Sequence, residues 1–441
     1  MSPSLLVVAD TDSYLKWGAA LASQLPEAWT SELVLVQTPA VPSARQRRVA
    51  LAGTRFSPAD ARIIELAELA EHVEAIRPDA VLLALRGPLV RVVAPLVGRG
   101  PDRPVLVSGF PGLTIPAEPK AVVYREQVDL IVLHSRREMR EFRANAEQLG
   151  VGTVRFGLAT LPFLRTVARQ SAGAAVAGGA GAAASDFDPD RTDLVFAAQA
   201  KVPAERDDRV RVLRWLADGA RRRPHRRVVV KVRARAGEAQ THAEAYDYAE
   251  LLADAVVRAE LGGTLPPNLV VEDGPMAEHL ARASSLVTVS STAVLEAIAE
   301  GVPALVIDEF GVAPKLINTV FEGSGLFGGA EALAAGEARH PDPEWLDDNY
   351  FHGSGADDWI DRLDELVARR RSAGLLLAAR RHNLAGGALR RAFERKRMLG
   401  RHDRSLAGMF AMAVAVPTRW CVRRVIRLRA RLATERAAAG A

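Results

Sequence analysis

Short, continuously apolar runs recur along the first part of the chain and alternate with segments of helical spacing. The runs lie at residues 5–8, 33–36, 80–85, 105–108 and 130–134. Strands that are apolar on both faces are typical of a parallel sheet covered by helices on both sides. The clearest helix is expected over 58–76, where Ser57 is a good N-cap and Pro58 fits the first helical position. Another is expected over 136–149 and ends before Gly150.

The same alternation begins again after a stretch of small residues. Residues 166–190 contain AAVAGGAGAAAS, which cannot build a core and is interpreted as a flexible linker. A long helix is expected over 243–261, among apolar runs at 194–197, 228–232, 269–271, 286–289 and 304–307. This pattern predicts an α/β protein with two doubly wound domains that face a cleft.

Three hydroxyl residues stand between a strand and a helix in the second half. Ser290, Ser291 and Thr292 follow the apolar run, and a helix is expected over 293–300. Hydroxyls and free backbone N–H groups at a helix start favour an anion such as a phosphate. Glu296 lies one turn inside, within reach of a ribose hydroxyl. The alternative is that the hydroxyl residues only cap the helix.

The segment SSTAVLEAIAEGVPALVI, residues 290–307, resembles the donor-nucleotide segment of glycosyltransferases with the GT-B fold. More narrowly, its two serines resemble the serine pair of bacterial sialyl-, polysialyl-, Kdo- and glycerophosphate transferases, which use cytidine nucleotides. Those enzymes often carry Lys-x-His-Pro after an earlier strand. Here Lys231 matches, whereas Arg233 and Ala234 replace the His and Pro. The whole chain is also similar to actinobacterial proteins described as "putative glycosyltransferases".

The resemblance implies a GT-B architecture of two Rossmann-like domains and a nucleotide-sugar donor. Together with the pattern along the chain, it predicts an acceptor-side domain at 1–165 and a donor domain at 191–345. The pattern also predicts a linker at 166–190, C-terminal helices at 346–400 and a basic amphipathic tail at 401–441. The residues expected to bind the donor are Lys231, Arg233, Arg235, Gly274, Ser290, Ser291, Thr292 and Glu296. GT-B enzymes generally do not need a chelated metal, so neither a metal nor a cofactor is expected.

The basic residues near 231 also point to an anion on physical grounds. Lys231, Arg233 and Arg235 alternate at the end of a predicted strand and lead into a loop that holds His242. Ligands of α/β sheets bind outside the carboxyl ends of the strands, and cations there suit a diphosphate or a sugar carboxylate. The chain has 52 arginines and only six lysines, so Lys231 carries more weight than its neighbours. A solvated basic loop is the alternative.

The candidates for acid–base chemistry lie in the first half. Asp10 and Asp12 follow the first strand, where a carboxylate would face the cleft and deprotonate an acceptor hydroxyl. The alternative is that one of them caps the next helix. His134 ends the fifth strand and is a second candidate base, with a structural histidine as the alternative.

A glycine-containing loop, SGFPGL, follows the fourth strand and is expected on the acceptor side. Its candidate residues are Ser108, Gly109 and Gly112, and the two glycines would allow close backbone approach to an acceptor or donor sugar. An ordinary turn is the alternative. Residues 323–328 match G-x-G-x-x-G by letter but follow a helical pattern, which excludes the dinucleotide interpretation. The sequence has no P-loop, H-E-x-x-H or C-x-x-C motif.

Charge is unevenly distributed along the chain. The total is +5, but residues 380–441 carry +13, which leaves −8 for the remainder. The segment TRWCVRRVIRLRARL, 418–432, places apolar residues near one face and arginines mostly opposite. A basic amphipathic helix is typical of a segment that lies on an anionic membrane surface, and packing on the acidic body is the alternative. Nucleic acid is not expected as a partner because no recognised module accompanies the charge.

The N-terminus lacks a basic region followed by a long apolar stretch, so no signal peptide is expected. A cytoplasmic protein is therefore expected, with peripheral attachment to the inner face of the cell membrane through the tail left open. The favoured function is a nucleotide-sugar-dependent glycosyltransferase that acts on a cell-envelope or secondary glycan, or on a lipid-linked acceptor. Two alternatives stay open: a non-hydrolysing sugar-nucleotide epimerase, and a degenerate GT-B domain that serves as a membrane-associated scaffold.

Overall fold

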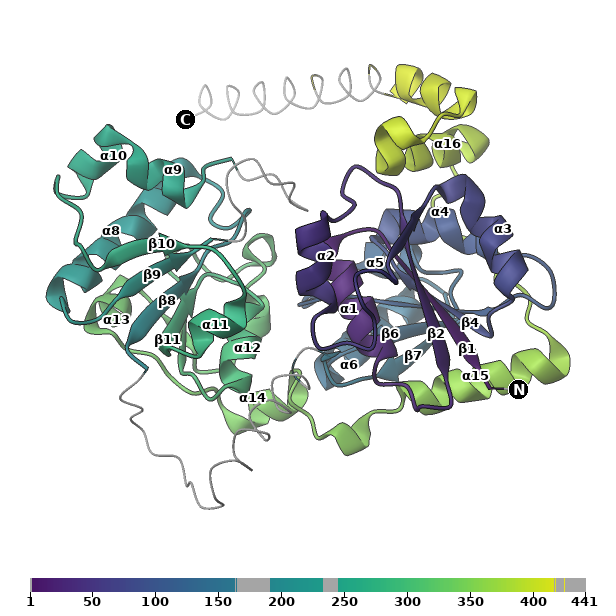
Figure 1. Ribbon diagram of the computed structural model, residues 1–441, viewed down its shortest axis with the longest axis horizontal. Coiled ribbons are helices and arrows are strands. Elements are labelled where there is room, and N and C mark those ends of the chain that lie inside the picture. Colours follow the sequence, from purple (N-terminus) through teal and green to yellow (C-terminus); the bar gives the residue numbers. More distant parts are fainter. Residues whose placement is uncertain are drawn as a thin grey trace, which may run out of the picture.

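Two parallel sheets, each surrounded by helices, make up the described part of the protein (Figure 1). The computed structural model describes residues 2–162, 164, 191–232, 245–415, 417 and 424. The strand order is β3-β2-β1-β4-β5-β6-β7 in the first sheet and β10-β9-β8-β11-β12-β13 in the second. Adjacent strands pair in parallel throughout both sheets. The predicted fold class of two doubly wound α/β domains is confirmed.

The first sheet consists of short Val-, Leu- and Ile-rich runs buried on both faces. Its strands are β1 (Ser4–Ala9), β2 (Thr30–Val36), β3 (Arg62–Ile64), β4 (Ala80–Ala84), β5 (Val105–Gly109), β6 (Leu130–Leu133) and β7 (Arg155–Leu158). The strand order reverses at β1, which pairs with β2 on one side and β4 on the other. Such a switch point opens a crevice at the carboxyl ends of the strands, where ligands bind in α/β proteins.

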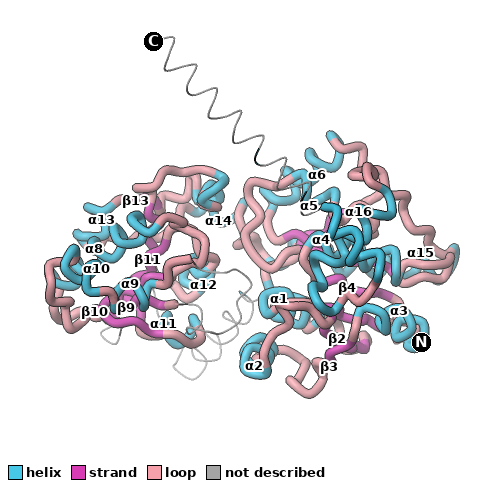
Figure 2. The backbone as a smooth tube through the Cα atoms, turned by 90° about the horizontal axis from the view of Figure 1, so that it is seen from above, coloured by secondary structure: helices cyan, strands magenta, loops and turns pink. Residues whose placement is uncertain are grey.

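Helices cover both faces of this sheet, as the view from above shows (Figure 2). They are α1 (Asp12–Ala22), α2 (Ala44–Leu51), α3 (Leu66–Ile76), α4 (Gly87–Val97), α5 (Pro119–Val123) and α6 (Arg136–Gln148). Side chains of alternating direction along the strands enter two separate hydrophobic clusters, one on each face. The expected helix over 136–149 ends one residue early, at Gln148.

The structure corrects the helix that was expected over 58–76. It begins only at Leu66, because Arg62–Ile64 pair with β2 as an edge strand. That pairing satisfies backbone groups that β2 would otherwise leave without partners on this side. Ser57 therefore caps no helix, and its backbone N–H donates to the carboxylate of Asp60 at 2.5 Å.

The second sheet repeats the plan with β8 at its switch point. Its strands are β8 (Asp193–Ala197), β9 (Val228–Lys231), β10 (Leu269–Glu272), β11 (Ala283–Thr288), β12 (Ala304–Ile307) and β13 (Phe327–Gly328). Its helices are α8 (Arg206–Arg222), α9 (Tyr248–Ala253), α10 (Ala255–Glu260), α11 (Met276–Leu280), α12 (Ala293–Ala299), α13 (Ala330–Ala335) and α14 (Pro343–Asp348).

The single long helix expected over 243–261 is also corrected within the described residues. Asp254 ends α9, and its carboxylate accepts the backbone N–H groups of Val256 and Val257, which starts α10. An aspartate side chain competes with the helical backbone in this way and is favoured at caps. Residues 243 and 244 lie outside the described residues.

The chain returns to the first domain after the second. Helix α15 (Trp359–Ala373) buries Trp359, Leu363 and Leu366 in the same cluster as α1 and β1, and runs along the lower edge of the first domain in Figure 1. Helix α16 (Gly387–Leu399) contributes Met398 and Leu399 to the opposite cluster, which also holds apolar residues of α4. The first core is therefore completed by residues that follow the whole second domain in the sequence. In the described part of the chain, no helix is long and apolar enough to cross a membrane.

Buried contacts join the two domains. Ile115, from the loop after β5, is 1% exposed and belongs to a core cluster of the second domain. Glu138 on α6 accepts hydrogen bonds from the hydroxyls of Thr114 and Tyr350, at 2.5 and 2.8 Å. Tyr350 lies in that same second-domain cluster, so Glu138 ties the first domain to the segment that leads back to it.

Candidate functional site

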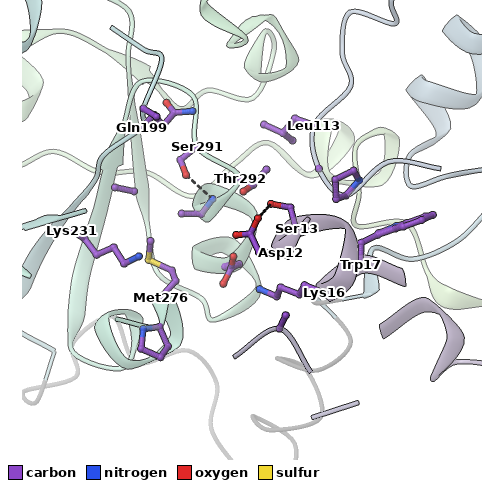
Figure 3. Close-up of a pocket in the computed structure, with 18 of the residues that line it drawn as sticks. Asp12, Ser13, Lys16, Trp17, Leu113, Gln199, Lys231, Met276, Ser291 and Thr292 are labelled. Carbon is purple, nitrogen blue, oxygen red and sulfur yellow. Dashed lines mark hydrogen bonds between the residues drawn. The ribbon is translucent and has the colours of Figure 1, made fainter. Parts of the chain in front are cut away.

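A cavity of about 520 Å³ lies between the two domains, at the carboxyl ends of their strands. Residues of α1 and α2 line it from the first domain. The end of β9 and residues that follow β8, β10 and β11 line it from the second. In Figure 3, Gln199, Lys231 and Met276 lie on one side, Leu113 and Trp17 on the other, with Asp12 between them. The cavity thus occupies the predicted cleft.

The turn after β11 forms the floor of the second-domain side. The backbone N–H and the hydroxyl of Ser290 both donate to Oε1 of Gln199, at 2.9 and 3.1 Å. The Thr288 hydroxyl donates to the carbonyl of Ala197 and accepts the backbone N–H of Ser291. These bonds tie the end of β11 to the end of β8 and fix where the following helix starts.

Ser291 and Thr292 line the cavity in front of α12. Oγ of Ser291, which precedes the N-cap residue Thr292, accepts the N–H of Ala293 at 3.2 Å. Thr292 makes no capping hydrogen bond through its side chain. Glu296 lines the cavity one turn along α12, which puts all three predicted residues on one wall. Whether they bind a phosphate and a ribose stays a prediction.

Lys231 and Gly274 also line the cavity. Lys231 is the last residue of β9 and is 8% exposed. Gly274 has a φ of 114°, a conformation that a residue with a side chain rarely adopts. The chain can therefore turn tightly past the cavity at this position. The predicted residues Arg233 and Arg235, and His242 with them, lie outside the described residues.

Asp12 is the acidic residue that the first β-strand brings to the cavity. It is the first residue of α1, and Thr11 is the N-cap, with Oγ1 accepting the N–H of Tyr14 at 3.4 Å. The N-cap is therefore not Asp12. Asp12 and Lys16, like Ser13 and Trp17, are spaced by four residues and so form two neighbouring rows on α1, and all four line the cavity.

The prediction that Asp10 serves as a base is not supported by its surroundings. Asp10 is fully buried and does not line the cavity. Its carboxylate accepts the Nε–H of Arg86 at 2.6 Å and the backbone N–H of Arg86 at 3.2 Å. Burial raises the pKa of Asp10, and the neighbouring Arg86 opposes that rise. Asp10 thus anchors the start of α4 to the end of β1.

His134 is likewise a structural residue, which corrects its prediction as a base. Its side chain is fully buried, and burial lowers its pKa to about 4. Nε2 lies 2.7 Å from the indole nitrogen of Trp17, and Nδ1 lies 2.9 Å from the carbonyl of Ala159. Because the indole can only donate, Nε2 accepts and Nδ1–H donates. Neither nitrogen is left for an acceptor hydroxyl.

The acceptor-side loop does not place Ser108 in the cavity. The Ser108 hydroxyl is buried, donates to the carbonyl of Leu83 and accepts the Nε–H of Arg125. At Gly109, a Cβ atom would lie 2.5 Å from the ring of Trp17, so the close approach there is to protein. Gly112 does line the cavity, and a Cβ atom on it would lie 3.2 Å from the Thr292 methyl group. This glycine lets the two domains approach each other beside the turn.

Residues 5–366 match the family described as "Putative glycosyltransferase (DUF6716)". The chain belongs to this family. It is similar in structure to UDP-GlcNAc 2-epimerase from Methanocaldococcus jannaschii, with a TM-score of 0.52, 11% identity, and 82% of this chain and 99% of that chain covered. It is also similar to UDP-N-acetylglucosamine 2-epimerase from Rickettsia bellii, with a TM-score of 0.52 and 14% identity, and 84% of this chain and 99% of that chain are covered.

A third solved structure, UDP-GlcNAc 2-epimerase from Neisseria meningitidis bound to UDP-GlcNAc, gives a TM-score of 0.50 and 10% identity over 83% of this chain and 100% of that chain. These likenesses show the fold, and they agree with the two-domain, GT-B-like architecture expected from the sequence. A comparison with curated proteins finds no match.

Several cavity residues of this family member escape sequence reasoning. Gln199 follows a predicted strand, but nothing in the sequence indicates that it holds the turn after β11. Helix α2 carries a signal that could have been used, because Ser43 and Gln46 form a capping box at its start. That signal would have placed Arg45 and Val49, which line the cavity, on a helix. In the described part of the chain, no three His, Cys, Asp or Glu side chains gather as a metal site.

Proposed function

We propose that this protein transfers a sugar from a nucleotide-sugar donor, bound in the cavity between its domains, to an acceptor hydroxyl. One observation carries the proposal. A carboxylate of the first domain, on Asp12, lines the same cavity as Lys231, Ser291 and Thr292 of the second. Anion-binding groups on one side and a proton acceptor on the other are what a transfer between two bound substrates requires.

In this proposal the second domain holds the donor. The hydroxyls of Ser291 and Thr292 donate to phosphate oxygens, and the ammonium of Lys231 balances their charge. Glu296, one turn along α12, accepts a hydrogen bond from a ribose hydroxyl. Arg233 and Arg235 follow Lys231 in the sequence and stay predicted donor-binding residues. The serine pair favours a cytidine nucleotide as donor, as in the bacterial transferases that the segment resembles.

The transfer itself is a substitution at the anomeric carbon. The acceptor oxygen forms a bond to that carbon while the bond from carbon to the phosphate oxygen breaks. The electron pair of that bond leaves with the nucleotide. The proton of the acceptor hydroxyl goes to the carboxylate of Asp12, which acts as general base. Asp10 and His134 have no part in this step.

The proposal extends to a glycan or lipid-linked acceptor of the cell envelope and to an anionic membrane surface. Residues 406–415 are helical, and Leu406, Met409 and Phe410 are 79%, 47% and 64% exposed on it. The next 20 or so residues are rich in arginine. Exposed apolar side chains next to basic ones favour attachment to the inner face of an anionic membrane.

Attachment is tested with a chain that ends at residue 415. The full-length protein should sediment with anionic liposomes at low salt, and the shortened protein should stay in the supernatant with an unchanged melting temperature. Full-length protein that ignores the liposomes would rule the membrane contact out.

Donor binding is tested by thermal shift with CMP, CDP, UDP and GDP and their sugar conjugates, because a ligand that binds only the folded chain raises its melting temperature. We expect one base to give a clear shift. Lys231→Met should remove most of that shift, whereas the control Lys120→Met, on α5 away from the cavity, should retain it. No shift with any nucleotide would support the scaffold alternative.

The epimerase alternative predicts a different outcome. Incubation with the stabilising nucleotide sugar alone would then change the configuration of the sugar, without any acceptor. Transfer instead leaves the donor sugar unaltered until an acceptor hydroxyl, or slowly water, takes it. Analysis of the sugar after incubation separates the two reactions.

A further inference from the structure

The first-domain wall of the cavity changes from polar to apolar along α1. Asp12, Ser13 and Lys16 line the cavity near the start of the helix, and Trp17 and Ala20 line it further along. Residues spaced by four along a helix lie one above another on the same face. Asp12, Lys16 and Ala20 form one such row, and Ser13 and Trp17 form the row beside it.

Helix α2 shows the same change beside it. Arg45 and Gln46 line the cavity in its first turn, and Val49 and Ala50 line it one turn later. Val49 is 52% exposed, so its side chain offers apolar surface to a molecule in the cavity. The apolar turns of the two helices face one cavity, so they form a single apolar wall.

Residues from two loops extend this wall. Pro111 and Leu113 follow β5, and Pro162 follows β7, and all three line the cavity. None of them brings a side chain that could hydrogen-bond to a sugar hydroxyl. The second-domain side holds both kinds of residue, because Gln199 and Ser291 offer polar groups there and Met276 is apolar.

The apolar wall is also rigid at its centre. The indole N–H of Trp17 donates to Nε2 of His134 at 2.7 Å, and the far edge of the ring packs against Gly109. Trp17 is 2% exposed and has little room to turn. His134 thus fixes Trp17 as packed support behind the wall, and the exposed apolar surface on this side is that of Val49.

We infer that the acceptor is amphiphilic, with its reacting hydroxyl beside Asp12 and an adjoining apolar group against the exposed side chain of Val49. This inference rests on the proposed function and adds the chemical class of the acceptor to it. A free hydrophilic glycan in this place would lose water from its hydroxyls without gaining hydrogen bonds, which costs free energy. An alkyl, prenyl or aryl group loses only contact with water, which is favourable.

Two glucosides that differ only in their apolar part test the inference. Octyl β-glucoside, below its micelle concentration, and methyl β-glucoside are titrated by saturation-transfer NMR. We expect the octyl compound to bind at least about tenfold more tightly, because each buried methylene contributes about 0.8 kcal/mol. Equal affinity for the two compounds would overturn the inference.

Matched variants locate the binding site of the octyl group. Val49→Gln should weaken octyl glucoside binding about fivefold, since it replaces an apolar contact worth about 1 kcal/mol. Val256→Gln changes the same residue type on the remote helix α10, where Val256 is 63% exposed, and should have no effect. Phe410→Gln should have no effect either. A loss with Phe410→Gln but not with Val49→Gln would place the probe on the helix at 406–415 and would overturn the inference.

Failure of this inference differs from failure of the proposed function. The nucleotide thermal shift depends on the second-domain wall and does not involve Val49. If nucleotides stabilise the protein while the two glucosides bind alike, the transferase proposal stands and the apolar acceptor is wrong. If no nucleotide raises the melting temperature, the transferase proposal fails. A preference for octyl over methyl glucoside that is lost in Val49→Gln would still establish an apolar binding site at Val49.

Discussion

Trp17 donates its indole N–H to Nε2 of His134, a residue 117 positions further along the chain, at 2.7 Å. The bond joins α1 to the end of β6 and fixes the histidine as the neutral tautomer with its proton on Nδ1. His134 lies at the carboxyl end of a strand, a position that often holds catalytic residues. Here both of its ring nitrogens make hydrogen bonds within the protein. The consequence can be measured through pH.

We predict that His134 makes the protein less stable in acid. Burial lowers its pKa to about 4 from an ordinary 6.5. Between these pH values the unfolded chain binds a proton at His134 and the folded chain does not. The contribution of neutral His134 to the free energy of unfolding is therefore complete above pH 6.5 and is lost as the pH falls to about 4. At about 1.4 kcal/mol per pKa unit, the loss is roughly 3 kcal/mol. His134→Gln should therefore show a shallower decline of unfolding free energy over this range in urea titrations. An unchanged slope would contradict the assignment.

We predict that Trp359 is essential to the first domain although it follows the second. It is 2% exposed in the cluster that contains Trp17, and Gly157 leaves room for its backbone and Cβ. Trp359→Ala should lower the unfolding free energy by about 3–5 kcal/mol, because a large cavity opens in a packed core. Trp359→Phe should cost much less. Equal melting temperatures of wild type and Trp359→Ala would show that the first core does not need α15.

We predict that Asp12 acts in the transfer step and Asp10 in folding. The donor is the nucleotide sugar that stabilises the protein in the thermal-shift test. Asp12→Asn should lower the rate at which nucleotide is released from this donor by about 100-fold or more, which is the usual contribution of a general base. The affinity for the donor should be nearly unchanged. The readout is nucleotide formation with octyl β-glucoside or water as acceptor. Asp10→Asn should instead lower the melting temperature, since Arg86 loses its charged partner. Undiminished release by Asp12→Asn would require another base.

Local patterns predict most of the fold, because they depend on neighbours in the sequence. Continuous apolar runs indicated the central strands, and the Ser290–Thr292 turn was found from its hydroxyls before a helix. Edge strand β3 was missed because Ile63 is 39% exposed and its neighbours also fit a helical spacing. Its structure depends on pairing with β2, which is a tertiary contact.

The candidate site was predictable only where one segment carries the signal. Asp10 and Asp12 look alike in the sequence, and what separates them is the distant Arg86, which reaches Asp10 from the start of α4. The same holds for Gln199 and Ser290, which lie 91 positions apart and meet only when β8 and β11 pair. Such roles follow from contacts between strands and are not encoded in any short motif.

The central claim is that a nucleotide binds at the turn after β11, and calorimetric titration of CMP, CDP, UDP and GDP tests it most directly. The proteins are wild type, the double variant Ser291→Ala with Thr292→Ala, and the control Asp342→Ala, which removes only the cap of α14. A lost cap costs about 1 kcal/mol of stability, whereas each lost hydrogen bond to a charged phosphate costs about 1.5–3 kcal/mol of affinity. We therefore predict at least tenfold weaker nucleotide binding for the double variant and unchanged binding for Asp342→Ala. A double variant that binds its nucleotide as tightly as wild type would contradict the claim and leave Ser291 and Thr292 as the start of a helix.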